Sequence, residues 1–330
     1  MSTLNITIFG TGAMGTLIAS RLDFLKSENK KCIPEINVNL FGTWKQQVEK
    51  IRKQGLTLEH IDGSRSIHHL NITDNIGNLP ASDIVIVLVK SYQTDRVARE
   101  IPQILAPAGI VITLQNGLGN RDILCKTIDS RRVGQGVTLQ GATVVEAGMI
   151  RHTAENSTYL APQPETEESI EQMAMIFRAA GLKTYIVDNA ESMIWGKLAI
   201  NIGVNPLTAL LEVQNGELAD NVMYRRIVAL AVREVKAVAC KLGISLPYSD
   251  PYAATISACH ASATNYSSML QDILNNRPTE IDSMCGEVIR LSERTDVRMP
   301  VNKFLLEHVK AKEQGIAFKP ELLRRVVQEN

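Results

Sequence analysis

Three polar side chains recur at every fourth position in an otherwise apolar stretch, residues 195–206. They are Lys197, Asn201 and Asn205, and only apolar residues or glycine separate them. In a helix this spacing places all three on one face. Burying a lysine and two amides is costly unless they are paired or used in chemistry. Two readings are open: a structural lysine tied to a carboxylate with asparagines capping neighbouring elements, or a lysine that acts chemically.

A glycine-rich turn follows a β-rich run, residues 4–9, at the start of the chain. It reads Gly10-Thr11-Gly12-Ala13-Met14-Gly15, and a helical pattern comes after it. In dinucleotide-binding folds the first glycine allows the tight turn, the second lets a pyrophosphate approach the backbone, and the third lets helix and strand pack closely. The N-terminus of the helix also attracts phosphate. This context predicts a dinucleotide site, against the alternative of an ordinary glycine-rich turn.

The next predicted strand, residues 37–42, ends without the Asp or Glu that usually holds the ribose hydroxyls of NAD. Thr43 and Lys45 stand there instead. The missing acid favours NADP, with both residues as candidate contacts of its 2′-phosphate. The alternative is that Lys45 simply begins a solvated helix.

Two continuous apolar runs, residues 84–89 and 109–114, predict strands that are buried on both faces, as in a parallel sheet. Lys90 follows the first run and Asn116 the second. Ligands of open α/β sheets bind outside the carboxyl ends of the strands, so we expect both side chains near the ribose and nicotinamide of a cofactor. A helix-start lysine and an Asn–Gly turn are the simpler alternatives. Short alternating segments from 133 to 159 predict antiparallel additions to the sheet.

Strand signals vanish after Asp188. Helical patterns then cover residues 217–242, 252–275, 279–295, 300–312 and 320–328. The fold class is therefore predicted as α/β, with an N-terminal Rossmann-like dinucleotide-binding domain (1–187) and an all-helical substrate-binding and catalytic domain (188–330). A cleft between them is the natural substrate site. Thr279 is expected to cap a helix with Glu280 in its first turn, a pattern that also suits a purely structural role.

Composition argues against several classes of function. The chain has 330 residues, 45% of them apolar, with 35 basic and 35 acidic side chains. This balance favours neither nucleic acid nor an anionic membrane, and the longest aliphatic run is too short to span a bilayer. The five cysteines are scattered without a C-x-x-C pair, which favours reduced thiols in a cytoplasmic protein over disulfides or a metal site. The first strand begins so early that we expect no signal peptide.

Eight motifs occur in one order along nearly the whole chain. They are Gly10-x-Gly12-x-x-Gly15, Lys90, Asn116-Gly117-x-Gly119, Lys197-Leu198-Ala199-x-Asn201, Asn205-Pro206-Leu207-Thr208-Ala209, Asn215-Gly216-Glu217-Leu218, Ser267-Ser268-Met269-Leu270-Gln271-Asp272 and Thr279-Glu280-Ile281-Asp282. In this order the sequence resembles the ketopantoate reductase (2-dehydropantoate 2-reductase) family. The blocks of the second half are far more specific than the glycine motif.

The resemblance implies roles for particular residues. Lys197 would be the general acid, and Glu280 would contact the cofactor and help poise the cleft. The substrate would be bound by Lys197, Asn201, Asn205, Asn215, Asn265, Tyr266, Ser267 and Ser268, the last on its carboxylate. The cofactor would be bound by Gly10, Thr11, Gly12, Ala13, Met14, Gly15, Thr43, Lys45, Lys90, Asn116, Val144 and Glu280. One departure is that Thr43 stands where the family usually has an arginine for the 2′-phosphate, which leaves the choice between NADPH and NADH open.

The resemblance also implies the reaction: NADPH-dependent reduction of 2-dehydropantoate (ketopantoate) to pantoate, a step of pantothenate and coenzyme A biosynthesis. The ammonium of Lys197 would stabilise the developing alkoxide and protonate it. A reductase of another 2-keto acid and a β-hydroxyacid dehydrogenase are enzyme alternatives, and a non-catalytic NADP-sensing protein is an alternative from another class. We expect no nucleic-acid partner and no membrane association, and the apolar helical domain is compatible with a homodimer.

Overall fold

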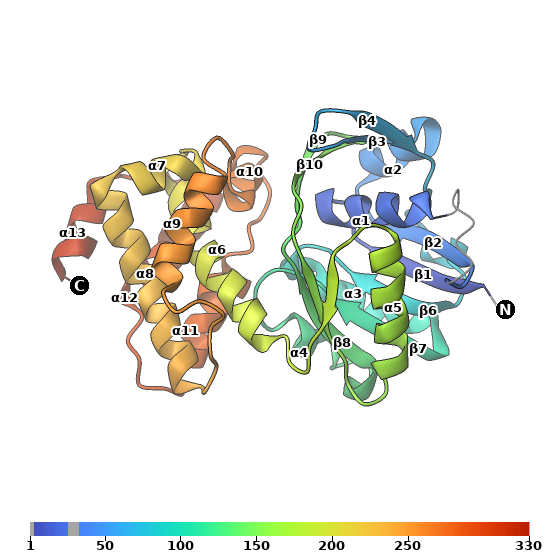
Figure 1. The fold of residues 1–330 in the computed structure, drawn as a ribbon. Coiled ribbons are helices and arrows are strands. Elements are labelled where there is room, and N and C mark those ends of the chain that lie inside the picture. Colours follow the sequence, from blue (N-terminus) through green and yellow to red (C-terminus); the bar gives the residue numbers. More distant parts are fainter. Residues whose placement is uncertain (1–2, 26–32, 330) are drawn as a thin grey trace. The chain divides into compact units, whose positions relative to one another are not determined.

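The computed structural model describes residues 3–25 and 33–329, which fold into two compact units. The first, which we call the sheet unit, comprises residues 1–115 and 120–190. The second, the helical unit, comprises residues 116–119 and 191–330. Figure 1 shows the strands of the sheet unit in blue to green and the helices of the helical unit in yellow to red. Each unit has a hydrophobic core of its own.

The sheet unit is built on an eight-stranded sheet in the order β12-β11-β8-β7-β6-β1-β2-β5. Its strands are β1 (Leu4–Phe9), β2 (Ile36–Phe41), β5 (Asn71–Thr73), β6 (Ser82–Val87), β7 (Leu105–Thr113), β8 (Val133–Thr138), β11 (Thr158–Ala161) and β12 (Thr184–Ile186). β1 pairs in parallel with both β2 and β6, so the strand order reverses beside it. Doubly wound sheets bind dinucleotides at such a reversal. The predicted Rossmann-like fold class is confirmed.

Helices cover both faces of this sheet. They are α1 (Ala13–Phe24), α2 (Lys45–Gln54), α3 (Thr94–Glu100), α4 (Asn120–Leu124) and α5 (Glu167–Ala179). Because side chains of a strand alternate between faces, Ile6 and Ile8 of β1 pack into the core that contains α1 and α5. Phe9 packs into the opposite core, with α3 and α4. Burial on both sides explains why the central strands read as continuous apolar runs.

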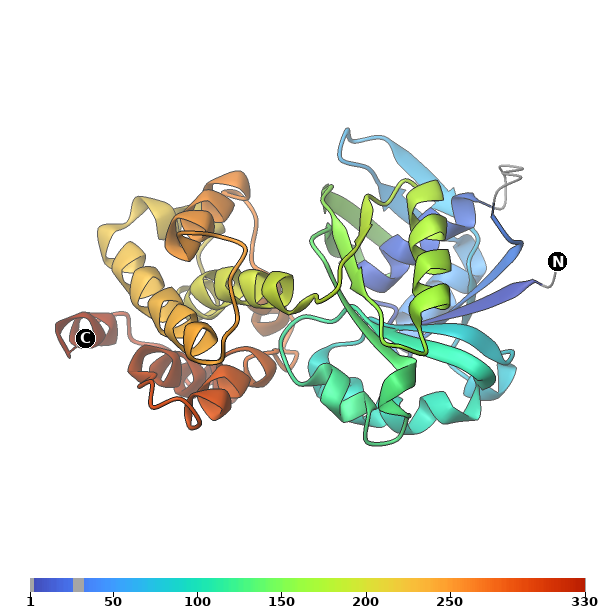
Figure 2. The ribbon, with the colours of Figure 1, turned by 60° about the horizontal axis from the view of Figure 1, so that its bottom comes forward.

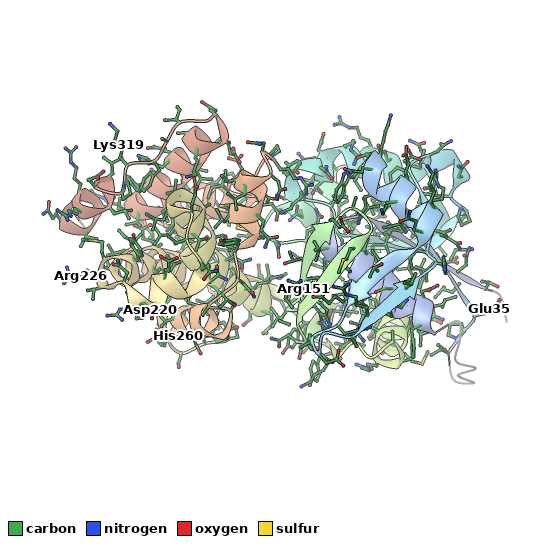
Figure 3. All side chains as sticks on the ribbon, turned by 90° about the horizontal axis from the view of Figure 1, so that it is seen from above. Glu35, Arg151, Asp220, Arg226, His260 and Lys319 are labelled. Atoms are coloured by element: carbon green, nitrogen blue, oxygen red, sulfur yellow. The ribbon has the colours of Figure 1, made fainter. Side chains whose placement is uncertain are left out.

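A separate four-stranded sheet in the order β4-β3-β10-β9 packs against α1. Its strands are β3 (Leu56–Glu59), β4 (Arg65–His68), β9 (Gly141–Glu146) and β10 (Met149–Ala154). The prediction of antiparallel additions to the main sheet is therefore right for β11, which runs antiparallel to β8. It is wrong for β8, which joins β7 in parallel, and for β9 and β10, which belong to the small sheet. β10 pairs with β9 and with the distant β3 instead. At the surface Arg151 of β10, labelled in Figure 3, forms an ion pair with Glu59 of β3.

The helical unit is organised around α6 (Glu191–Leu211), which packs most extensively against the later helices α8, α9, α10 and α12. The other helices are α7 (Asn215–Asp220), α8 (Val222–Lys241), α9 (Pro251–Ala261), α10 (Ser268–Leu274), α11 (Glu287–Ser292), α12 (Pro300–Glu313) and α13 (Leu322–Glu329). Figures 1 and 2 show α6 in yellow-green with the later helices around it. By length and composition alone α6 resembles a membrane span, but 78% of its apolar window is buried inside the unit. This burial identifies it as a core helix.

The predicted helix from 217 to 242 is two helices in the structure. Asn221 lies between α7 and α8, and its Oδ1 accepts hydrogen bonds from the N–H groups of Met223 (2.9 Å) and Tyr224 (3.3 Å). An asparagine in this role satisfies the free N–H groups of a new helix. The apolar periodicity continues across it, which is why the sequence read as one helix.

The predicted helices from 252 to 275 and from 279 to 295 are also interrupted. The first divides into α9 and α10, because Ser267 Oγ caps α10 by accepting from Leu270 N at 3.1 Å. The second contains a π-helical turn at residues 282–286 before α11. Such turns are frequent at functional sites. The last two predicted helices are confirmed as α12 and α13.

Candidate active site

The three motif glycines between β1 and α1 meet different surroundings. A Cβ on Gly15 would lie 1.9 Å from the carbonyl oxygen of Gly10, and one on Gly10 would lie 2.6 Å from that of Leu88. A Cβ on Gly12 would meet no atom within 4 Å. Gly10 and Gly15 are therefore required by packing of the chain itself, whereas Gly12 faces open space at the N-terminus of α1. The first N–H groups of α1, from Ala13 onward, are suited to bind an anion there.

Thr11 is held in place by a residue that sequence reasoning missed, Gln47 of α2. Gln47 Nε2 donates to the carbonyl oxygen of Thr11 at 3.1 Å, and its Oε1 accepts from the N–H of Gly148 at 2.7 Å. The side chain of Gln47 is fully buried. Gln47 shares the buried face of α2 with Val48 and Ile51, and its bonds to distant backbone groups leave no local signal in the sequence.

The candidate 2′-phosphate contacts lie beyond the carboxyl end of β2. Thr43 and Lys45 are both exposed, and Lys45 is the first residue of α2. β2 is the direct neighbour of β1 in the sheet, so these side chains follow the strand next to the glycine turn. An exposed lysine at a helix N-terminus fits a phosphate contact and a solvated surface equally well.

The ends of β6 and β7 are tied together by Gln115, a second residue that the sequence did not single out. Its Nε2 donates to the carbonyl oxygen of Val89 at 2.9 Å and to Thr94 Oγ1 at 2.8 Å. Lys90 lies three residues beyond the end of β6, just before a short helical turn at 91–93. Val144 lies on β9, half-buried against the core under α1. The sheet unit thus collects Lys90, Thr43 and the glycine turn at the carboxyl ends of its parallel strands.

Asn116, by contrast, begins a short segment that packs with the helical unit. The N–H of Leu118 donates to the carbonyl oxygen of Ser283 at 2.8 Å. Gly117 has φ +78°, and a Cβ there would lie 2.7 Å from that same oxygen. Close approach and a left-handed backbone together require glycine at this position.

On α6 the predicted line of polar side chains is present. Lys197 and Asn201 are partly buried and Asn205 is buried. Removal of the amine from water lowers the pKa of Lys197 to about 8, and the charge of Glu280 acts in the opposite direction. The carboxylate of Glu280 is therefore close enough to act on this lysine. Glu280 is itself buried, so it is not the surface partner of a helix dipole that a purely structural reading requires.

Neighbouring loops bring further predicted residues to this face of α6. Asn205 Nδ2 donates to Ser268 Oγ at 3.4 Å and approaches Met284 Sδ at 3.9 Å. Ser268 is exposed, as are Asn265 and Tyr266 before it. The helical unit thus brings Glu280 to Lys197 and Ser268 to Asn205, two residues on the same face of α6.

Two of the predicted substrate residues are engaged in structural bonds. Ser267 Oγ accepts from Thr208 Oγ1 at 2.7 Å in addition to capping α10. Asn215 Nδ2 donates to Ser262 Oγ at 3.0 Å, and its N–H donates to the carbonyl oxygen of Asn265. The buried Oδ1 of Asn215 has no hydrogen-bond partner among the described residues. An unsatisfied buried amide oxygen is costly and is a ready acceptor for a ligand hydroxyl.

The described ranges contain no cluster of three or more histidine, cysteine, aspartate or glutamate side chains that could hold a metal ion. The four cysteines in these ranges, Cys125, Cys240, Cys259 and Cys285, are free thiols. Cys32 lies outside the described residues. A partly buried lysine beside a carboxylate, with two amides on the same helix face, can donate a proton and orient an oxygen-rich substrate.

Comparison with known proteins identifies the family. The family model described as "Ketopantoate reductase PanE/ApbA" matches residues 6–165, and that of the family's C-terminal part matches residues 189–313. A curated 2-dehydropantoate 2-reductase of Pyrococcus horikoshii is 32% identical over 311 residues, which cover 94% of this chain and 98% of the relative. The chain belongs to the ketopantoate reductase family. It is an oxidoreductase of that type, as the resemblance implied.

Other similar proteins include a further 2-dehydropantoate 2-reductase and an enzyme with a different name. A 2-dehydropantoate 2-reductase of Halobacterium salinarum is 29% identical over 93% of this chain and 98% of its own length. A ternary structure of D-mandelate dehydrogenase with NADH and anilino(oxo)acetate superimposes with a TM-score of 0.83 at 27% identity, covering 94% of this chain and 99% of the other. The ketopantoate reductase fold therefore includes a structure that holds NADH.

Proposed function

We propose that the protein reduces 2-dehydropantoate to pantoate with NADPH, and that Lys197 is the general acid. The observation that carries the proposal is the polar cluster on α6. A lysine with a pKa of about 8 lies beside a buried carboxylate and is followed on the same helix face by two asparagines. A pKa near working pH suits a group that must give up a proton and be recharged.

Each polar side chain has its own role toward the substrate. The ammonium of Lys197 donates a hydrogen bond to the keto oxygen, stabilises the negative charge that develops there and transfers its proton to it. Asn201 and Asn205 orient the substrate hydroxyl without adding charge. Ser268, exposed beside Asn205, binds the carboxylate. Glu280 keeps the lysine charged, because its negative charge raises the pKa that burial lowers.

The glycine turn fits the pyrophosphate of a dinucleotide, since only Gly12 leaves open space at the N-terminus of α1. When bound, the reduced nicotinamide supplies the hydride. Thr43 and Lys45 are the proposed contacts of the 2′-phosphate, together with Lys90 and Asn116 for the rest of the cofactor. Hydrogen bonds from a threonine and one lysine recognise a phosphate less specifically than a bidentate arginine does, so we expect measurable turnover with NADH.

A second candidate substrate is another 2-keto acid, and the likeness to D-mandelate dehydrogenase favours it. One methylene group more or less in an apolar pocket separates such substrates by only about 1 to 3 kcal/mol. We further propose that the protein works in the cytoplasm, in keeping with its free thiols, on a small molecule and without nucleic acid or membrane. A homodimer stays a prediction, which sedimentation velocity tests.

The decisive experiment measures initial rates of NADPH and NADH oxidation with ketopantoate and with phenylglyoxylate. Lys197→Ala is run beside Lys303→Ala, a control that removes an exposed lysine of α12. We expect ketopantoate with NADPH to be preferred and Lys197→Ala alone to lose about 100-fold or more in kcat with cofactor binding intact. Faster turnover of phenylglyoxylate would establish the second candidate. Equal rates for the two variants would contradict the role of Lys197.

A further inference from the structure

The segment that carries Glu280 is anchored along α12. The N–H of Thr279 donates to Glu313 Oε1 at 2.7 Å, and Asp282 Oδ2 accepts from Lys310 Nζ at 2.6 Å. Glu280 lies between these two anchor points. Further on, Cys285 Sγ donates to Asn302 Oδ1 at 3.5 Å. One helix therefore fixes the path of the chain on both sides of the buried carboxylate.

The same end of α12 also holds the end of α6. Lys312 Nζ donates to the carbonyl oxygen of Leu210 at 3.0 Å and to Glu212 Oε1 at 2.7 Å. Lysine at this place satisfies a free carbonyl of the helix C-terminus and its partial negative charge. Lys312 and Glu313 are adjacent in α12. Lys312 therefore bonds the helix that carries Lys197, and Glu313 bonds the segment that carries Glu280.

The other end of α12 is held equally firmly. The carboxylate of Glu234 on α8 accepts from the N–H groups of Val301 (2.9 Å) and Asn302 (3.0 Å) and from Asn302 Nδ2 (2.7 Å). Both Glu234 and Asn302 are buried. A carboxylate at a helix N-terminus makes strong, charge-assisted hydrogen bonds. α12 is thus fixed to α8 at its start and to α6 and the Glu280 segment at its end.

The position of Glu313 does not stabilise its own helix, α12. It is the last residue of α12, where a negative charge opposes the helix dipole. Its carboxylate accepts a hydrogen bond from the N–H of Thr279, a residue that is only 5% exposed. Without that acceptor this buried N–H would lose its hydrogen bond, which is costly for a buried donor. The bond therefore serves the Glu280 segment.

We propose that Glu313 is a positioning residue for the reaction: it holds the Thr279 backbone so that the Glu280 carboxylate stays beside Lys197, while Lys312 fixes the helix that carries Lys197. The inference rests on the proposed function, in which Lys197 is the acid. It assigns Glu313 no contact with substrate or cofactor. Its effect passes entirely through Glu280.

A displaced Glu280 has a defined consequence for Lys197. Burial lowers the pKa of this lysine to about 8, and Glu280 is the group that raises it. When the carboxylate moves away, only the lowering effect remains, and the pKa falls. Lys197 then loses its proton at a lower pH, so the basic limb of the pH profile of kcat shifts to lower pH. A general loss of packing would reduce kcat without this shift.

The test compares Glu313→Ala, Glu313→Gln and Glu313→Asp, with Glu307→Ala as the control that removes an exposed charge from the same helix. Gln keeps an oxygen acceptor for the Thr279 N–H, whereas Asp keeps the charge on a side chain one methylene shorter. We expect the basic limb of kcat to move down by about half a pH unit or more in the Ala and Asp variants. The Gln variant and the Glu307→Ala control should match wild type. If Glu313→Ala does not fold, Glu313→Asp carries the comparison.

A second readout does not need turnover. Competitive acetylation of lysines with acetic anhydride across pH, quantified by peptide mass spectrometry, gives the titration midpoint of Lys197, with exposed Lys303 as reference. We expect the same downward shift in the Ala and Asp variants. An unchanged midpoint in both, or an equal shift in the Gln variant, overturns the positioning role. If no 2-keto acid is reduced by wild type, the proposed function fails, while this midpoint still decides the role of Glu313.

Discussion

Burial of Lys197 disfavours its charged form, which is the form that can donate a proton. The pKa of this lysine falls from its ordinary value of 10.5 to about 8. Between these two values the unfolded chain holds a proton at this position that the folded chain does not. Because stability rises with pH wherever the unfolded state binds more protons, this residue makes the fold more stable as pH rises from 8. Over the same range the protonated, active form is lost.

Stability and activity should therefore change in opposite directions with pH. The free energy of unfolding of wild type, relative to that of Lys197→Met, is expected to rise by roughly 2 kcal/mol from pH 8 to pH 10. Over that interval kcat of wild type should fall about tenfold per pH unit well above the pKa. Urea denaturation and initial rates at each pH measure both. A stability difference that does not change with pH would show that the lysine keeps its ordinary pKa.

Gly12 and Gly15 offer a matched pair within one turn. A Cβ on Gly12 meets nothing within 4 Å, whereas one on Gly15 lies 1.9 Å from a backbone oxygen. Gly12→Ala should change the free energy of unfolding by less than about 0.5 kcal/mol and weaken NADPH binding by about tenfold or more. Gly15→Ala should destabilise the fold by about 1 to 3 kcal/mol. Thermal denaturation and fluorescence titration with NADPH separate the two effects, and unchanged NADPH affinity in Gly12→Ala would exclude the turn as the phosphate site.

Among the secondary-structure elements, α10 has a cap and a candidate ligand side by side. Ser267 caps the helix and accepts from Thr208, and Ser268 is exposed next to Asn205. Ser267→Ala should cost about 1 to 2 kcal/mol of stability, because a cap is lost. Ser268→Ala should leave stability unchanged and raise KM for the keto acid severalfold. Urea denaturation and steady-state kinetics of both variants test this division, which the reverse pattern would refute.

Elements whose signals are local could be predicted from the sequence. The strand–glycine turn–helix at residues 4–24 and the buried strands β6 and β7 follow from apolar runs and turn glycines alone. The breaks at Asn221 and Ser267 were missed because apolar periodicity runs through them, although both residues are good N-caps. The small sheet was missed because it pairs β3 with β10, about ninety residues later, and no local pattern encodes such a partner.

The site was predictable to a similar extent. The four-residue spacing placed Lys197, Asn201 and Asn205 on one helix face, and the structure confirms that placement. The family's motifs supplied Glu280 and Ser268, and no spacing argument could bring the first to Lys197 or the second to Asn205. Gln47 and Gln115 were invisible because their role is to bond backbone groups of distant segments. Such bonds depend on tertiary structure.

At the scale of the whole molecule, the chain enters the helical unit twice, first through residues 116–119. Gly117 allows this segment to pack closely against Ser283, because its φ is +78° and a Cβ would lie 2.7 Å from the Ser283 carbonyl oxygen. Gly243 has a similar φ of +77° with nothing within 4 Å, which makes it a control for backbone strain alone. Gly243→Ala should lose about 1 kcal/mol of stability from backbone strain, and Gly117→Ala should lose more because its Cβ also clashes with the Ser283 oxygen. Only Gly117→Ala should also lose kcat, measured with ketopantoate, and equal rates for the pair would contradict a role for this contact.

The central position of α6 has a consequence for biosynthesis. Its partners α8, α9, α10 and α12 all follow it in the sequence, the last ending at Glu313. At roughly 5 to 20 residues per second, a ribosome needs about 5 to 20 s to add the hundred residues that bury this helix. During that interval a segment with the hydrophobicity of a membrane span is outside the ribosome without its core. Ribosome-bound chaperones should therefore engage this nascent chain most strongly just after α6 emerges, and early stop codons beyond it should give aggregates rather than shortened enzymes.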